Sequence, residues 1–161
     1  MSVYCPECWA EVPGEAQACP ACGCSLAGGS EAYVDKLITA LRHFEPTRAA
    51  LAIYILSDML REPRVVAPLV ELLDTAGDAF VLRSAARALG RFGDARAVPA
   101  LRRRALGSTT PLVVRVAAVD ALARIGGDQA RAALADALGD SNGTVREHAG
   151  QALQQALSSQ S

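Results

Sequence analysis

A repeat with a period close to 33 residues is the feature that most constrains the fold of this chain. Four leucines anchor the repeat, and the residue four positions before each of them is alanine. The anchors are separated by 33, 33 and 31 residues and are Leu56, Leu89, Leu122 and Leu153. These positions share one face of a helix, and the small alanines let a neighbouring helix approach closely. A period of this length predicts a solenoid of stacked helical units.

Each anchor helix is expected to pair with a second amphipathic helix. Turn signals follow three of the anchors, as Glu62-Pro63, Gly93-Asp94 and Gly126-Gly127-Asp128. Apolar residues at helical spacing then return after each turn. The pattern predicts three helix pairs, with half-repeats at about residues 31–44 and 144–157.

Two C-x-x-C pairs lie near the N-terminus, as Cys5 with Cys8 and Cys19 with Cys22. This spacing fits one tetrahedral site of four thiolates, for which Zn²⁺ is the usual metal. Four protein ligands leave no open coordination position, so a single structural Zn²⁺ is predicted. A redox-active dithiol is the alternative. Cys24 is an additional thiol beside this site.

The predicted chain is all-α after a small zinc ribbon. It divides into a ribbon at residues 1–26, a short linker at 27–30 and a helical array at 31–161. The net charge of −1 gives no overall attraction to nucleic acid or to anionic lipid. No signal segment or membrane-spanning stretch is recognised, and cysteines at metal spacing fit a reducing compartment. A cytoplasmic protein without membrane contact is therefore expected.

Residues 114–126 read V-R-V-A-A-V-D-A-L-A-R-I-G, and residues 81–94 have a similar sequence. Over about residues 47–157 the chain resembles the short HEAT-like repeats found in phycobilin lyases and in a deoxyhypusine hydroxylase family. The resemblance implies a right-handed α-α superhelix. The first repeat departs most from the pattern, since Arg48 replaces a valine and its helix lacks the terminal glycine.

Residues 4–26 resemble the small zinc ribbons in which each knuckle reads C-P-x-C-G. The second knuckle keeps the glycine as Gly23, and the first has Trp9 in its place. Glycine at this position allows a positive φ. Trp9 has two interpretations. It is an exposed anchor for a partner, since tryptophan is enriched at binding hot spots, or it covers the ribbon core or docks on the helices, which we favour.

A basic stretch between residues 80 and 104 holds seven arginines and one acid, Asp94. The candidates for a binding strip are Arg83, Arg87, Arg91, Arg102, Arg103 and Arg104. The first three are four residues apart and share one face of an anchor helix. The last three lie on the second helix of that pair, which the resemblance implies lines the concave face. The strip is interpreted as a docking site for an acidic protein partner or, more simply, as a solvated surface.

The resemblance also brings an enzymatic alternative, since hydroxylase members of the HEAT-like family bind iron through several His-Glu dipeptides. This chain has two histidines, His43 and His148, and the second follows Glu147 in reversed order. No catalytic group or small-molecule site is recognised. The sequence therefore predicts a non-enzymatic scaffold or adaptor that binds a protein partner. Two alternatives stay open, a lyase- or hydroxylase-related protein and a nucleic-acid-associated zinc-ribbon protein. No aromatic residues interleave with the arginines, so nucleic acid is not the expected partner.

Overall fold

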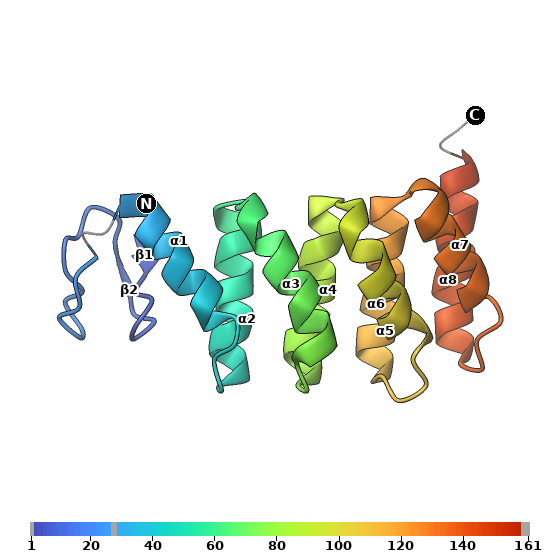
Figure 1. Ribbon diagram of the computed structural model, residues 1–161, viewed down its shortest axis with the longest axis horizontal. Coiled ribbons are helices and arrows are strands. Elements are labelled where there is room, and N and C mark those ends of the chain that lie inside the picture. The colour runs from blue at the N-terminus through green and yellow to red at the C-terminus, as the bar shows by residue number, and fades with distance from the viewer. Residues whose placement is uncertain (1, 27–28, 159–161) are drawn as a thin grey trace.

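The computed structural model describes residues 2–26 and 29–158, which form a small ribbon followed by a helical array (Figure 1). The ribbon holds an antiparallel pair of strands, β1 (Ser2–Tyr4) and β2 (Glu11–Pro13). The helices are α1 (Gly29–Ala40), α2 (Pro46–Tyr54), α3 (Val66–Thr75), α4 (Ala79–Phe92), α5 (Val98–Leu106), α6 (Leu112–Ile125), α7 (Gly127–Ala137) and α8 (Gly143–Ser158). The predicted helical solenoid behind a small ribbon is confirmed.

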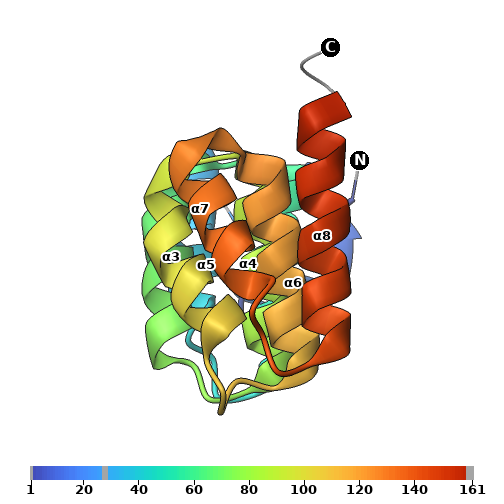
Figure 2. The same cartoon turned by 90° about the vertical axis from the view of Figure 1, so that its right-hand side faces the viewer.

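The helices of the array lie in two layers, which Figure 2 shows along the array. One layer contains α2, α4, α6 and α8, and the other contains α3, α5 and α7. α1 packs on α2 and lies between the array and the ribbon. No helix in the described part of the chain combines the length and the apolar character needed to cross a membrane.

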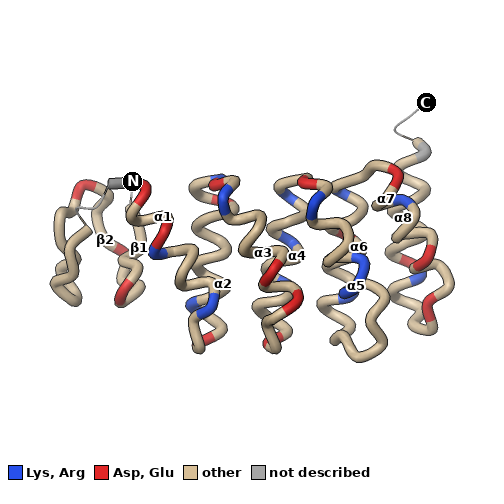
Figure 3. The backbone as a smooth tube through the Cα atoms, in the orientation of Figure 1, with Lys and Arg blue, Asp and Glu red and all other residues tan. Residues whose placement is uncertain are grey.

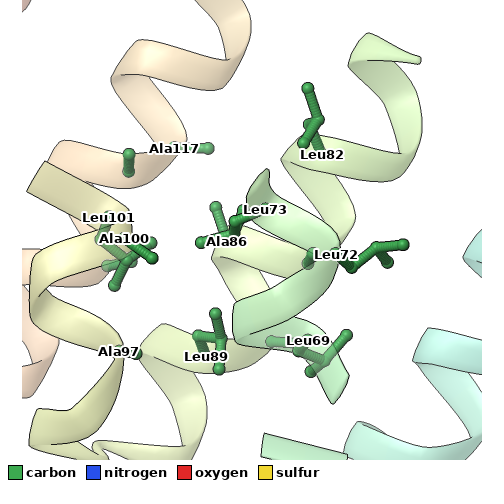
Figure 4. Packing of buried hydrophobic residues seen from close by; sticks show 14 of the residues in the cluster. Leu69, Leu72, Leu73, Leu82, Ala86, Leu89, Ala97, Ala100, Leu101 and Ala117 are labelled. Carbon is green, nitrogen blue, oxygen red and sulfur yellow. The ribbon is translucent and has the colours of Figure 1, made fainter. Parts of the chain in front are cut away.

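A continuous apolar core fills the space between the layers (Figure 4). Three of the four repeat anchors, Leu56, Leu89 and Leu122, are fully buried in it. The fourth, Leu153, is only partly buried because it lies on α8, the last helix of the array. The helical period of the sequence therefore identified the face that each inner helix buries.

The helices of one layer approach each other more closely than those of the other. A Cβ atom built on Gly90 of α4 would lie 2.8 Å from the Cα atom of Ala121 on α6. The contact between α3 and α5 in the other layer is much looser. A solenoid curves towards the layer whose helices are more closely spaced. We therefore refer to α2, α4, α6 and α8 as the inner layer, and to α3, α5 and α7 as the outer layer.

We expect Gly90→Ala to lower the free energy of unfolding by about 1–3 kcal/mol, because its methyl group would overlap the Ala121 backbone. The gain in helix propensity, about 1 kcal/mol, acts in the opposite direction. Urea unfolding followed by circular dichroism measures the difference. Gly77→Ala is the control, since its Cβ would meet no atom within 4 Å. Equal effects of the two substitutions would contradict the close approach of α4 and α6.

The start of the array differs from the sequence prediction. α1 ends at Ala40 rather than near residue 44, because the amides of Leu41 and His43 bond three residues back and form a tight turn. Phe44 beyond this turn is 90% exposed. Of the predicted linker, residues 27 and 28 lie outside the described residues, and α1 already begins at Gly29.

The first repeat is one residue longer than the second between its anchor and the acid that caps the next turn. Glu62 follows Leu56 by six positions, whereas Asp94 follows Leu89 by five. The segment Ile55–Met59 forms a π-helix, whose wider turn takes up the extra residue. The helix that follows is therefore in the same register as its counterparts.

The ends of the inner-layer helices use a backbone with positive φ. Gly93 ends α4 at a φ of 68°, and Gly126 ends α6 at a φ of 67°. In the first repeat Arg61 has this conformation, with a φ of 51°. The missing glycine of the first repeat thus leaves the turn itself intact.

Candidate metal centre and inner-layer surface

Each cysteine pair lies in a tight knuckle. The Trp9 amide donates to the Cys5 carbonyl at 2.8 Å, and the Gly23 amide donates to the Cys19 carbonyl at the same distance. Trp9 and Gly23 both have a positive φ, of 64° and 74°. The two knuckles therefore have equivalent turns, and Trp9 adopts a conformation that glycine takes without strain.

The knuckles bring four thiols together. The Sγ atoms of Cys5, Cys8, Cys19 and Cys22 all lie within 4.8 Å of one another. Cys5 and Cys22 are 3.7 Å apart, and Cys8 and Cys19 are 3.5 Å apart. Tetrahedral Zn²⁺ with Zn–S bonds of about 2.3 Å requires sulfur atoms about 3.8 Å apart. The donors fit one four-thiolate metal site. Among the described residues, no other cluster of His, Cys, Asp or Glu could hold a metal ion.

The thiols of this cluster have perturbed pKa values. Burial raises the pKa of Cys5, but hydrogen bonds from the backbone of Cys8 and Glu7 outweigh it and lower this pKa to about 6. The backbone of Ala10 lowers the pKa of Cys8, whereas burial and the neighbouring thiols raise it to about 12. A hydrogen bond to Cys5, followed by burial, raises the pKa of Cys24, whose Sγ lies 3.3 Å from that of Cys5. Metal binding at such a cluster releases protons, so it weakens at low pH.

The ribbon docks on α1. The Tyr33 hydroxyl donates to the Tyr4 carbonyl at 2.9 Å, and Lys36 Nζ lies 3.6 Å from Glu7 Oε1. Tyr4 and Trp9 are partly buried and pack against the core of the helical array. Trp9, a sequence candidate for partner binding, thus lies at the contact between ribbon and array.

We expect Trp9→Gly to keep the metal content of the protein but to loosen the ribbon from α1. Glycine suits the positive φ at this position, and the contact of the indole with the array is lost. Amide hydrogen exchange in the first turns of α1 should therefore become faster. Trp9→Phe, which keeps an aromatic contact, is the matched control. Unchanged exchange in Trp9→Gly would show that the indole does not hold the ribbon in place.

The six candidate arginines do not form one strip, because the two layers separate them. Arg102 and Arg103 lie on α5 in the outer layer, where each is paired with an aspartate of a neighbouring repeat. Arg102 lies 2.7 Å from Asp136, and Arg103 lies 2.7 Å from Asp74. Arg104 donates to a backbone carbonyl of α3. These three residues are not on the concave side, as the sequence analysis had expected, because the closely spaced helices form the other layer.

The other three candidates lie on α4 in the inner layer. Arg91 is paired with Asp58 at 2.6 Å. The Arg83 guanidinium lies 5.6 Å from the centre of the Phe80 ring. Arg87 has no acidic partner in the part of the chain that the structure describes. The inner layer therefore carries arginine charge that is not fully neutralised.

Three grooves follow one another along the inner layer. Their volumes are about 290 Å³ between α2 and α4, 520 Å³ between α4 and α6, and 190 Å³ between α6 and α8. Arg87 lines the first two grooves, and Arg124 of α6 lines the last two. The sequence analysis did not single out Arg124. The repeat could have identified it, since it follows Arg91 by one period of 33 residues.

The two histidines lie at different ends of the array. His43 follows α1 and stacks on Phe44, with ring centroids 4.5 Å apart. His148 lies on α8, where its Nδ1 atom is 2.9 Å from an Asp120 carboxylate oxygen. The structure therefore does not bring the two imidazoles together.

Comparisons with known proteins agree with this architecture. A family model described as HEAT repeats matches residues 34–113 and 103–154. Among solved structures, human deoxyhypusine hydroxylase, in complex with glycerol, is similar with a TM-score of 0.63 and 27% sequence identity. The similarity covers 75% of this chain and 42% of the hydroxylase chain, so this chain spans less than half of that protein. No curated protein matches the chain.

The hydroxylase corrects one prediction from the sequence. We predicted that the chain is not an enzyme, because no catalytic group is recognisable along it. A similar protein with stacked helical repeats is an enzyme, so that prediction is wrong as an argument from architecture. Side chains from separate repeats converge on the same face of a solenoid, and local sequence patterns do not show such convergence.

Proposed function

Because this chain belongs to the HEAT-repeat family, we propose that it is a scaffold or adaptor that binds a protein partner along its inner layer. The observation that carries this proposal is the series of three grooves on successive inner helices. Extended surfaces of this kind are what stacked repeats offer to a binding partner. The docked ribbon extends the array at its N-terminal end and provides a second surface for recognition.

We assign Zn²⁺ to the four-thiolate site, in a structural role. Four cysteine ligands at tetrahedral spacing support this assignment, since such sites leave no position for a substrate. Four reduced thiols at metal spacing also support a cytoplasmic location. Elemental analysis of the purified protein should find one zinc per chain, and Co²⁺ exchanged into the site should give the absorption bands of tetrahedral thiolate ligation. A protein that binds neither metal would contradict the assignment.

Site-specific crosslinking tests the scaffold proposal. A photo-reactive amino acid at Val113, which is 52% exposed on the inner layer, should capture a defined protein from a lysate of the source cells. The same amino acid at Ala132, exposed on α7 in the outer layer, is the matched control. Capture at Val113 and not at Ala132 supports binding along the inner layer. Equal capture, or no capture at either position, contradicts it.

A second candidate function follows from the similarity to deoxyhypusine hydroxylase. The identity of 27% over 75% of this chain supports an enzyme related to that protein. Our sequence comparison implies that such hydroxylases bind iron, so metal analysis separates the candidates. Iron that purifies with the protein and is retained when the four cysteines are replaced would support the enzyme. Zinc that is lost with the cysteines would support the structural site alone.

A further inference from the structure

The groove between α4 and α6 has an apolar surface that the fold leaves open to solvent. Leu112 and Val113 are 41% and 52% exposed, and Val116 lines the groove beside them. All three lie on α6 and face the α4 side of the groove. The volume of about 520 Å³ is sufficient for a side chain of a partner.

Arginines surround this apolar surface. Arg83 and Arg87 of α4 and Arg124 of α6 line the groove. In the described part of the chain, none of the three has an acidic partner. Asp120 is the one acid that lines the groove, and it is engaged by His148 at 2.9 Å. The rim of the groove therefore has a net positive charge.

The outer layer shows what the fold does with arginines that stabilise the array. Arg102 and Arg103 each reach across to an aspartate of a neighbouring helix, and both distances are 2.7 Å. Acidic and basic residues thus alternate along α3, α5 and α7 (Figure 3). The arginines at the groove have no such internal role. This difference between the layers assigns their charge to an external partner.

We propose that the groove between α4 and α6 binds an acidic peptide segment of a protein, with one aliphatic side chain as its anchor. The anchor packs on Val113 and Val116, and carboxylates on both sides of it pair with Arg87 and Arg124. The proposal rests on the scaffold function and specifies the chemistry of its partner. An apolar floor complements a peptide side chain better than a phosphodiester backbone, and the groove is lined by no aromatic residue on which a base could stack.

Selection from a random peptide library displayed on phage tests this proposal with the full-length protein. We expect enriched peptides to carry Asp or Glu on both sides of a single Leu, Ile, Met or Phe. Fluorescence anisotropy of an enriched peptide should show an affinity that falls as NaCl is raised, because salt screens the charge pairs. Enrichment without acidic residues, or no enrichment, would overturn the proposal.

Two variants locate the site on the groove. The triple variant Arg83→Glu, Arg87→Glu, Arg124→Glu should weaken binding by about tenfold or more, since three attractions become repulsions. Val113→Asp should also weaken binding, through loss of the apolar floor. The control is Arg61→Glu, Arg96→Glu, Arg131→Glu, which has the same change in net charge away from the groove. Circular dichroism checks that all variants keep their helices.

The outcomes separate the proposal from its alternatives. Equal loss of affinity in the triple variant and its control would show a non-specific charge effect and overturn the site. Tighter binding of a single-stranded oligonucleotide than of the peptides, lost in the triple variant, would identify the surface as a nucleic-acid site. If Val113 crosslinks to a protein but the library yields no acidic peptides, the scaffold function stands and the inferred chemistry of the partner is wrong.

Discussion

Removal of the metal by a chelator should unfold the ribbon, while most of the helical circular dichroism signal remains. The buried core of the ribbon consists of Cys5, Val12 and Cys19, and two of these are metal ligands. A core this small does not hold a fold without its metal. The helical array has a separate and much larger core. Trp9, the single tryptophan of the chain, packs against that core, so its emission should shift to longer wavelength as the ribbon detaches.

Substitutions give the same test without a chelator. Cys19→Ser should lose stoichiometric metal and show the red-shifted Trp9 emission, because it removes a buried ligand. Cys24→Ser should keep both the metal and the emission, since Cys24 is not one of the four clustered ligands. Unchanged emission after complete metal removal would contradict the dependence of the ribbon on its metal. Loss of most of the helical signal would instead show that the docked ribbon is needed for the array to fold.

Arg115→Met should lower the free energy of unfolding by about 3–5 kcal/mol, the cost of leaving one member of a buried ion pair alone. Arg115 of α6 is paired with Asp140, and both side chains are only 8% exposed. The Arg115 Nε–H also donates to the Ala105 carbonyl at 2.9 Å, which ties α6 to the end of α5. Chemical unfolding monitored by circular dichroism measures the loss.

The matched control is Arg102→Met, which breaks the exposed pair with Asp136. Exposed pairs contribute about 0–1 kcal/mol, so this substitution should have a small effect. The double variant Arg115→Met, Asp140→Leu should recover part of the stability that Arg115→Met loses, because no buried charge remains unpaired. Similar losses for Arg115→Met and Arg102→Met would contradict the importance of burial.

The same pair predicts a dependence of stability on pH. Hydrogen bonding from the Asn142 amide, followed by the bond and charge of Arg115, holds the pKa of Asp140 below its usual range. A carboxyl whose pKa is lower in the folded state stabilises the fold above its unfolded pKa of about 3.9 and loses this contribution as the pH falls through the folded pKa. Stability should therefore fall below about pH 4. In Arg115→Met this fall should be smaller, as acid titrations of unfolding would show.

Local patterns predicted most of the fold and the metal centre. Leu89 and Leu122 are buried because each helix has one apolar stripe, and the helical period locates that stripe. The four thiols come together because each C-x-x-C pair turns within a few residues. Both signals lie within single elements or within one short ribbon.

The surface could not be predicted in the same way, because its contacts cross between repeats. Arg103 pairs with Asp74 over 29 positions, and Arg102 pairs with Asp136 over 34. The order of residues does not show which arginines find such partners. The distinction between neutralised arginines in the outer layer and Arg124 in the inner layer therefore required the structure.

The π-helix at Ile55–Met59 has a consequence for comparing and recombining such proteins. A one-residue insertion at this place is absorbed locally, so an inherited change in chain length need not alter the helices on either side. Alignments of repeats from one gene should therefore permit a single gap there, whereas searches with a rigid unit length will miss related copies. Repeats of unequal length could likewise be exchanged between arrays if the exchange points lie beyond this turn.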